Sequence, residues 1–326
     1  MPESAWKVVF LDAATFDRED VSFAAFEQRY ACTFHRVTNS AETAARLAGH
    51  EAVISNKVLI DAAAMDAAKE TLKVIAVAAT GTNNVDLAAA KARGIPVCNV
   101  AGYSGSGVAQ HAFALLLELC NHAGRYAEDN RREAAWAGSP FFCRLTYPCV
   151  ELSGKTLGLI GYGDIARNVE QIARGFGMNI LIAGRKGSAE APAGRTPFDE
   201  VLRKSDAVSL HCPLTPETKD LIGSRELGLM KSSAFLINTA RGGIVQETAL
   251  IAALKSKRLA GAGFDVCTVE PPPREHPLLR AAQELDNLIL TPHTAWSTLE
   301  SRQRLLDGVF ENLKAFEAGR ERNKVN

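Results

Sequence analysis

The sequence lacks the features that would place the protein among nucleic-acid-binding or membrane proteins. Its 326 residues carry 37 Lys and Arg against 37 Asp and Glu, so the formal net charge is zero. A chain with balanced charge lacks the excess of positive charge that is typical of proteins binding nucleic acid or an anionic membrane. The best apolar run, about residues 113–119, is too short to cross a bilayer, and residues 1–10 lack a signal-peptide pattern. The sequence therefore predicts a cytoplasmic protein that binds neither nucleic acid nor a membrane.

Cysteine occurs without any of the patterns that give it a special function. The seven cysteines are odd in number, are scattered along the chain, and include no CxxC pair. A zinc site or a disulfide framework would require paired or regularly spaced cysteines. The sequence therefore predicts reduced, structural thiols and no metal site.

Two sets of short apolar runs alternate with helical segments along the chain. Such alternation predicts βαβ units and a parallel sheet, whose strands are apolar throughout because both faces are buried. The first set lies at residues 8–11, 52–54, 74–77 and 96–98, and the second at residues 156–160, 179–182, 207–210, 234–237, 261–264 and 288–290. The sequence predicts an α/β protein with two doubly wound parallel-sheet domains.

Two longer helical segments are also present. Residues 104–132 form a helical stretch whose middle is apolar nearly all round, so we expect it to be buried between domains or subunits. Residues 298–316 have the spacing of an amphipathic helix. We find no internal repeat and no low-complexity tract.

A glycine-rich turn directly follows the predicted strand 156–160. Gly161-Tyr162-Gly163-Asp164-Ile165-Ala166 has the G-x-G-x-x-A spacing of the dinucleotide-binding fingerprint. Gly161 permits the tight turn, Gly163 allows the backbone to approach a pyrophosphate, and Ala166 allows close packing of helix on strand. The free N–H groups of the helix N-terminus then attract the phosphates. The turn therefore predicts a dinucleotide cofactor.

The end of the next strand indicates which dinucleotide is bound. An NAD site places Asp or Glu about 20 residues beyond the fingerprint, where it binds the ribose hydroxyls. Here that position, by count and by strand end, is Gly184, and Arg185 and Lys186 follow it. Without the carboxylate nothing repels a 2′-phosphate, and Arg185 has the planar donors to pair with it. This favours NADP(H). NAD(H) stays open as the alternative, in which Arg185 and Lys186 form a solvated turn.

Three later segments place polar residues at predicted strand ends. They are Asn238–Gly243 with Arg241, Phe264–Pro271 with Asp265 and Glu270, and Thr291-Pro292-His293. Open α/β sheets bind ligands at the carboxyl ends of their strands. Taken singly, Arg241 could be a surface cation, Glu270 a solvated carboxylate and His293 a core histidine. Their joint occurrence at three strand ends favours an active site.

At this point the chain resembles the D-isomer-specific 2-hydroxyacid dehydrogenase family over nearly its full length. The resemblance is carried by residues 78–86 (AATGTNNVD), by residues 211–218 (HCPLTPET), and by the order of Arg241, Glu270 and His293. Within the family, residues 108–111 (VAQH) and 270–272 (EPP) are most similar to the glycerate dehydrogenase, or hydroxypyruvate (glyoxylate) reductase, branch.

The resemblance implies a role for each of the three residues. Arg241 would bind the substrate carboxylate through its planar fork of donors. His293 would act as the general acid in reduction and as the base in the reverse direction. Glu270 would hydrogen-bond the far ring nitrogen of His293, fix its orientation and favour its protonated form.

The resemblance also implies further contacts. Asp265 would contact the nicotinamide end of the cofactor, and Ala79, Thr80 and Gly81 would meet the substrate from the other domain. Trp296 stands where many relatives have a Gly-rich segment, and we expect it to narrow the pocket toward small substrates. The remaining predicted cofactor contacts are Gly161, Gly163, Asp164, Ile165, Arg185, Lys186, Cys212, Pro213, Thr218, Thr239, Ala240, Arg241, His293 and Ala295.

The resemblance further implies how the chain is divided. Residues 1–100 with 296–326 would form a flavodoxin-like substrate domain, and residues 101–295 an inserted Rossmann-type dinucleotide domain, with the active site in the cleft. The expected reaction is hydride transfer to hydroxypyruvate or glyoxylate, giving D-glycerate or glycolate. The family and the apolar helix suggest a homodimer.

Two alternatives stay open from the sequence alone. One is a dehydrogenase acting on another small acid, such as D-lactate, 3-phosphoglycerate or phosphite. The other is a dinucleotide-sensing interaction protein, because transcriptional corepressors share this fold. Turnover with a panel of 2-keto acids would separate an enzyme from a sensor.

Overall fold

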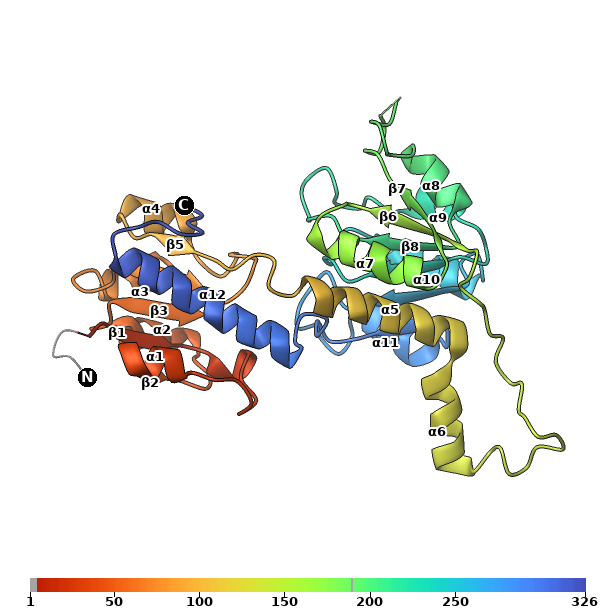
Figure 1. The fold of residues 1–326 in the computed structure, drawn as a ribbon, viewed down its shortest axis with the longest axis horizontal. Helices are drawn as coiled ribbons and strands as arrows, with labels where there is room; N and C mark the ends of the chain where they lie inside the picture. Colours follow the sequence, from red (N-terminus) through yellow and green to blue (C-terminus); the bar gives the residue numbers. More distant parts are fainter. Residues whose placement is uncertain (1–4, 189) are drawn as a thin grey trace. The chain divides into compact units, whose positions relative to one another are not determined.

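The computed structural model describes residues 5–188 and 190–326, and it divides the chain into two compact units. The first unit, here called unit 1, combines the chain up to Ser104 with Trp296–Asn326. The second, unit 2, is the inserted segment Gly105–Ala295. Each unit is built around one parallel sheet, as Figure 1 shows.

The sheet of unit 1 has five strands in the order β2-β1-β3-β4-β5. This is the flavodoxin-like strand order, in which the direction of winding reverses between the first and third strands. The strands are β1 (Lys7–Phe10), β2 (Ala31–Phe34), β3 (Ala52–Ser55), β4 (Val74–Val77) and β5 (Val97–Cys98). The helices are η1 (Ala13–Thr15), α1 (Ala24–Arg29), α2 (Ser40–Leu47), α3 (Ala62–Ala67), α4 (Leu87–Ala92) and α12 (Leu299–Glu317).

The sheet of unit 2 has six strands in the order β11-β10-β9-β8-β6-β7. The strands are β6 (Thr156–Ile160), β7 (Asn179–Ile182), β8 (Ala207–Leu210), β9 (Phe235–Asn238), β10 (Gly261–Phe264) and β11 (Leu288–Leu290). A parallel bridge between Ala183 and Thr196 lies beyond the end of β7 and takes the place of one further strand. Because the order reverses between β6 and β8, the sheet has its ligand-binding switch point there.

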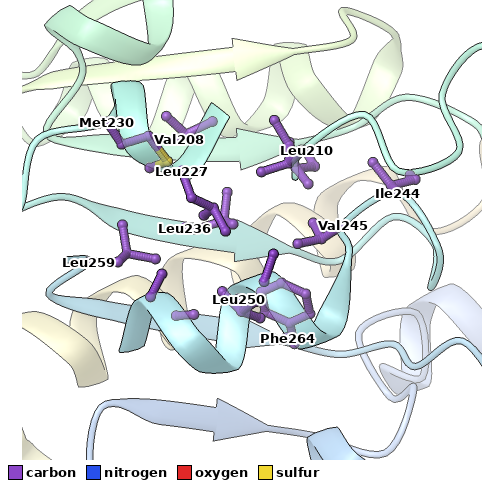
Figure 2. Close-up of a cluster of buried hydrophobic side chains, with 14 of the residues drawn as sticks. Val208, Leu210, Leu227, Met230, Leu236, Ile244, Val245, Leu250, Leu259 and Phe264 are labelled. Atoms are coloured by element: carbon purple, nitrogen blue, oxygen red, sulfur yellow. The ribbon is translucent and has the colours of Figure 1, made fainter. Parts of the chain in front are cut away.

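Helices cover both faces of this sheet. They are α5 (Gly105–Asn121), α7 (Asp164–Gly175), α8 (Phe198–Lys204), α9 (Ser224–Leu229), α10 (Glu247–Lys255) and α11 (Pro277–Glu284). Helix α6 (Ala123–Glu133) follows α5 and has no buried residue. Figure 2 shows one of the two cores, where Leu236 of β9 and Phe264 of β10 pack against Leu227 of α9 and Leu250 of α10. Each such buried side chain contributes about 1.5–3 kcal/mol through the hydrophobic effect.

The helical stretch predicted at residues 104–132 is not one helix. His122 adopts the left-handed conformation, with φ at 51°, and separates α5 from α6. The apolar face of α5 packs inside unit 2, against α7 and the sheet, so the prediction that it is buried between domains or subunits was wrong for this face. No helix among the described residues is long and apolar enough to cross a membrane.

Candidate active site

The glycine-rich turn has the geometry that its sequence predicts. Gly161 has φ at +84°, and a Cβ there would lie 2.6 Å from the backbone of His211 and Cys212, so only glycine fits. A Cβ on Gly163 would meet nothing within 4 Å, so the space above this residue is open. Gly163 is the N-cap of α7, and Ala166 is fully buried in the following turn. The turn therefore leaves an open cradle beside a helix N-terminus.

A cleft of about 920 Å³ opens next to this turn, beside the ends of β6, β7 and β8. Its volume lies at the upper end of the range typical of small-molecule sites. Six residues with a predicted cofactor contact line it: Gly161, Arg185, Lys186, Cys212, Pro213 and Thr218. The structure thus gathers residues that lie up to 57 positions apart in the sequence around one cavity.

Polar atoms without a partner support the fit of a dinucleotide to this region. The buried Nε2 of His211 and the buried Oγ1 of Thr239 have no hydrogen-bond partner among the described residues. Burial lowers the pKa of His211 to about 4, so its ring is neutral at physiological pH. Free donors on a helix N-terminus, an open glycine cradle and unpaired polar groups are the features that a dinucleotide would use.

The two cations after β7 have different surroundings. Lys186 donates to the carbonyl oxygen of Leu221 at 2.8 Å and forms an ion pair with Glu226, also at 2.8 Å. Burial favours the neutral form of Glu226, but hydrogen bonds from Lys186 and Arg225 outweigh this effect and lower its pKa to about 2. Lys186 therefore already has a buried partner. Arg185 is exposed at the cleft. The hydrogen bond from Thr215 lowers the pKa of the nearby Glu217, and the positive charge of Arg185 adds a smaller effect in the same direction.

Glu270 and His293 meet directly. His293 Nδ1 lies 2.6 Å from Oε2 of Glu270, and Oε1 of Glu270 accepts a hydrogen bond from the backbone N–H of Cys267 at 2.9 Å. Because a carboxylate only accepts, the Nδ1 of His293 carries the proton in this contact. Both side chains are about one-third exposed, so the pair is held in place and remains accessible.

The turn that carries His293 is built on Asp265. The Asp265 carboxylate is fully buried and accepts from Thr291 Oγ1 at 2.6 Å and from the backbone N–H groups of Thr294 and Ala295 at 2.9 and 2.8 Å. The backbone N–H of His293 donates to Asp265 O at 2.9 Å, which helps to hold its positive φ of 52°. Asp265 therefore shapes the turn, and a direct contact with the nicotinamide stays a prediction.

The turn that carries Arg241 lies against the Glu270 segment. The buried side chain of Asn238 braces this turn, since its Nδ2 donates to Arg241 O and its Oδ1 accepts from the N–H of Ala240, both at 3.1 Å. A Cβ on Gly242 would overlap the carbonyl oxygen of Cys267, so the two backbones touch. Arg241 itself is exposed, and its guanidinium donates to Ala240 O at 2.7 Å. The three predicted catalytic residues thus come from adjacent strand ends of one sheet.

Comparisons with known proteins show the family to which the chain belongs. Residues 113–295 match the model of the D-isomer specific 2-hydroxyacid dehydrogenase NAD binding domain. The chain is 41% identical over 321 residues to a glycerate dehydrogenase of Methylorubrum extorquens, covering 98% of each protein. The chain belongs to the D-isomer specific 2-hydroxyacid dehydrogenase family.

Two further proteins extend the comparison. A hydroxypyruvate reductase of Blautia hydrogenotrophica is 36% identical over 326 residues, with 98% of this chain and 99% of that protein covered. The crystal structure of the TT0316 protein from Thermus thermophilus superposes with a TM-score of 0.83 at 34% identity, covering 98% of this chain and all of that one. This confirms the predicted α/β fold with two parallel-sheet domains.

Two residues at the proposed site were not predicted from the sequence. The first is His111, whose Nε2 lies 2.9 Å from Thr291 Oγ1 and 3.5 Å from the Asp265 carboxylate. Arg195 lines the dinucleotide cleft with its guanidinium over the Tyr162 ring, at 5.1 Å from the ring centroid. No local sequence pattern marks Arg195, because it is brought to the cleft by the bridge between Ala183 and Thr196, which forms only in the folded chain.

The remaining predicted residues lie where their elements begin or end. Asp164 and Ile165 open α7, and Thr239 and Ala240 follow β9. In unit 1, Ala79–Gly81 follow β4, where Thr80 donates through Oγ1 to Val100 O at 3.1 Å. Trp296 packs edge-on against Tyr103 of the same unit, with ring centroids 6.3 Å apart. Among the described residues, no group of three or more His, Cys, Asp or Glu side chains is arranged to hold a metal ion.

Proposed function

We propose that this family member reduces hydroxypyruvate or glyoxylate to D-glycerate or glycolate with a reduced nicotinamide dinucleotide. The observation that carries the proposal is the 2.6 Å contact between His293 and Glu270, beside the Arg241 turn. The names of the glycerate dehydrogenase and hydroxypyruvate reductase that resemble the chain support this choice of substrate.

In the proposed reaction Arg241, His293 and Glu270 have separate roles. Arg241 binds the substrate carboxylate with two parallel N–H donors and so orients the C2 carbonyl. His293 gives its proton to the carbonyl oxygen as that oxygen becomes negative, and the product is the neutral hydroxyl. Glu270 keeps the second ring nitrogen protonated and stabilises the imidazolium before transfer. The bound dinucleotide supplies the hydride that reaches C2.

The two units would divide this work. Unit 2 contains the matched dinucleotide-binding domain and the three catalytic residues, and we propose that it binds the cofactor through the cleft described above. We propose that Ala79–Gly81 and Trp296 of unit 1 complete the substrate site and that Trp296 restricts it to small acids. All seven cysteines are unpaired, which supports a cytoplasmic location.

A keto-acid panel tests this proposal. Wild-type protein is assayed with NADPH and with NADH against glyoxylate, hydroxypyruvate, pyruvate and bulkier 2-keto acids, following loss of reduced nicotinamide. We expect turnover to be fastest with hydroxypyruvate or glyoxylate. Trp296→Ala should raise the rate of reduction of bulkier acids relative to that of glyoxylate. An unchanged ranking of the acids by rate would contradict the proposed role of Trp296. Absence of turnover on every acid would instead favour a dinucleotide-sensing protein.

We further propose that the preferred cofactor is NADP(H). Gly184 leaves no carboxylate at the end of β7, and the cleft beside it is lined by Arg185 and Arg195. The backbone N–H of Gly184 donates to Thr196 O at 2.8 Å, which holds the Arg195 segment next to this position. Two guanidinium groups at one edge of the cleft suit a ribose 2′-phosphate. Lys186 contributes less, because Glu226 already neutralises it.

Removing these two cations should reverse the cofactor preference. We expect Arg185→Ala and Arg195→Ala each to raise KM for NADPH about 10- to 100-fold, since each charge-assisted hydrogen bond is worth about 1.5–3 kcal/mol and about 1.4 kcal/mol is tenfold. KM for NADH should change less than about 2-fold, because NADH has no 2′-phosphate. Arg203→Ala, on the exposed face of α8, is the matched control. A clear wild-type preference for NADH would contradict the assignment.

We also propose that the protein is a homodimer. Helix α6 has no buried residue, and in Figure 1 it extends from the end of α5 into a long loop. This loop exposes Trp136, Phe141, Phe142 and Leu145, with Phe142 90% and Leu145 88% accessible. Exposed apolar patches of this kind mark interaction surfaces, and a second copy of the chain fits the symmetry common among enzymes.

Charges placed in this loop should separate the subunits. We expect the double variant Phe142→Asp with Leu145→Asp to elute as a monomer, because each carboxylate would lose its water in an apolar interface. Size-exclusion chromatography with light scattering gives the mass. Val37→Asp, at an exposed apolar residue of unit 1, should leave the mass unchanged. A dimeric double variant, or a monomeric wild type, would contradict the proposal.

A further inference from the structure

Three polar side chains lie together beside the segment that carries Glu270. None of them has a role in the proposed reaction. They are Glu247 at the first position of α10, Thr268 after β10, and His276 at the N-cap of α11. The side chains of Glu247 and His276 are only 11% and 6% exposed. Buried polar groups are expensive unless they are hydrogen-bonded, so their arrangement needs a physical reason.

Glu247 and His276 hold Thr268 through both its backbone and its side chain. Glu247 Oε1 accepts from the backbone N–H of Thr268 at 2.8 Å, and Glu247 Oε2 lies 3.1 Å from the Thr268 hydroxyl. His276 Nε2 lies 3.1 Å from the same hydroxyl and 3.5 Å from Glu247 Oε2. Thr268 is therefore fixed by two helices whose positions are set by the core of unit 2.

Thr268 directly follows Cys267, whose backbone holds Glu270 beside His293. The preceding backbone N–H, that of Cys267, donates to Glu270 Oε1 at 2.9 Å, and Glu270 Oε2 meets His293 at 2.6 Å. The Cys267 carbonyl touches Gly242, which follows Arg241. Burial first, and then the charges of Glu247 and Glu270, raise the pKa of the Cys267 thiol to about 11.

We propose that Glu247 is a positioning residue that, through Thr268 and with His276, sets the placement of Glu270 against His293. This inference rests on the proposed function, because it concerns the proton-delivering pair of the same site. The carboxylate suits this task since it accepts two hydrogen bonds at once and lies at a helix N-terminus, where negative charge is favoured. Misplacement of a reacting group by about 1 Å can cost roughly 100-fold in rate.

Substitutions at Glu247 separate positioning from general stability. Glu247→Ala should lower kcat for hydroxypyruvate reduction about 10- to 100-fold, while the Kd for NADPH, measured by fluorescence, changes less than about 2-fold. Glu247→Gln keeps an oxygen that accepts from the Thr268 N–H, so it should restore kcat to within about 3-fold of wild type. Glu284→Ala removes an exposed ion pair between α10 and α11 and serves as the matched control, with kcat unchanged.

A second readout does not depend on turnover. In protein labelled with ¹⁵N-histidine, the side-chain spectra report which ring nitrogen of His293 carries the proton. We expect the Nδ1–H form in wild type and in Glu247→Gln, and a mixture of both forms in Glu247→Ala. If Glu247→Ala does not fold, Thr268→Val carries the same test, because it removes the hydroxyl and keeps the backbone N–H. It should lower kcat about 5-fold with unchanged NADPH binding.

The outcomes distinguish this inference from the proposed function. A wild type that reduces hydroxypyruvate while Glu247→Ala keeps its full kcat overturns the positioning role alone. Parallel losses of kcat, cofactor binding and melting temperature in Glu247→Ala, without rescue in Glu247→Gln, also overturn it. A wild type that turns over no keto acid contradicts the proposed function, and the His293 spectra then decide the positioning role by themselves.

Discussion

Replacing His293 by Asn is expected to lower kcat for hydroxypyruvate reduction by about 1,000-fold. General acid catalysis contributes about 100- to 10,000-fold, and Asn keeps a polar side chain but has no proton to give to the carbonyl oxygen. Asn also tolerates the left-handed backbone found at this residue, with φ at 52°, so the turn should survive. Steady-state kinetics with saturating cofactor measure the effect.

Two controls make this expectation specific to proton transfer. Binding of NADPH to His293→Asn, followed by fluorescence, should stay within a few-fold of wild type, since the cleft beside the glycine-rich turn is unaltered. His35→Asn, in unit 1 and outside the proposed machinery, should keep full activity. A kcat for His293→Asn within about 3-fold of wild type would mean that another group supplies the proton.

Replacing Arg241 by Ala is expected to lower kcat/KM for the keto acid by about 100- to 1,000-fold. Two charge-assisted hydrogen bonds to the substrate carboxylate are worth about 3–4 kcal/mol together, and each 1.4 kcal/mol is tenfold in rate. Arg241→Lys keeps the charge and loses the planar fork, so its kcat/KM should lie between wild type and Arg241→Ala. Initial rates over a range of hydroxypyruvate concentrations separate KM from kcat.

The matched control for Arg241 is Arg280 on α11, whose guanidinium pairs with the exposed Glu275 at 3.1 Å. An exposed pair of this type contributes little, so Arg280→Ala should retain wild-type kinetics. Equal kcat/KM values for Arg241→Lys and wild type would show that the fork geometry is not used. A kcat/KM of Arg241→Ala equal to that of wild type would show that the substrate carboxylate binds elsewhere.

The sequence was sufficient to predict features that depend on local pattern. The apolar runs, such as residues 207–210, lie on strands as predicted, because a buried parallel strand needs apolar side chains on both faces. The turn at Gly161 was also predictable, since its positive φ and the closeness of His211 admit no other residue. Both arguments use only short stretches of chain.

Features that depend on distant partners could not be predicted in this way. Lys186 was assigned to the cofactor, but Glu226 forms an ion pair with it, and no local pattern indicates this pairing. The role of Asp265 in shaping the His293 turn follows from contacts with residues 26 to 30 positions away. The break between α5 and α6 was missed because His122, unlike glycine or proline, gives no clear signal for a left-handed residue.

The site also shows how its parts depend on one another. Three buried or nearly buried polar side chains each hold a turn. Asn238 holds the turn after β9, Asp265 the turn that carries His293, and Glu247 the segment that carries Glu270. Such satisfied polar groups fix a backbone more tightly than apolar packing alone, because any displacement leaves them unpaired. This explains how the exposed side chain of Arg241 and the partly exposed side chain of His293 can be accurately placed.

Single-turnover reduction tests the central claim most directly. Wild type and Glu270→Gln are each loaded with NADPH, mixed with hydroxypyruvate, and followed by the loss of reduced nicotinamide and by chiral analysis of the product. We expect rapid formation of D-glycerate by wild type and a first turnover at least about 10-fold slower in Glu270→Gln, whose amide no longer stabilises the protonated imidazole. Formation of the L-isomer, or equal first-turnover rates for the two proteins, would contradict this expectation.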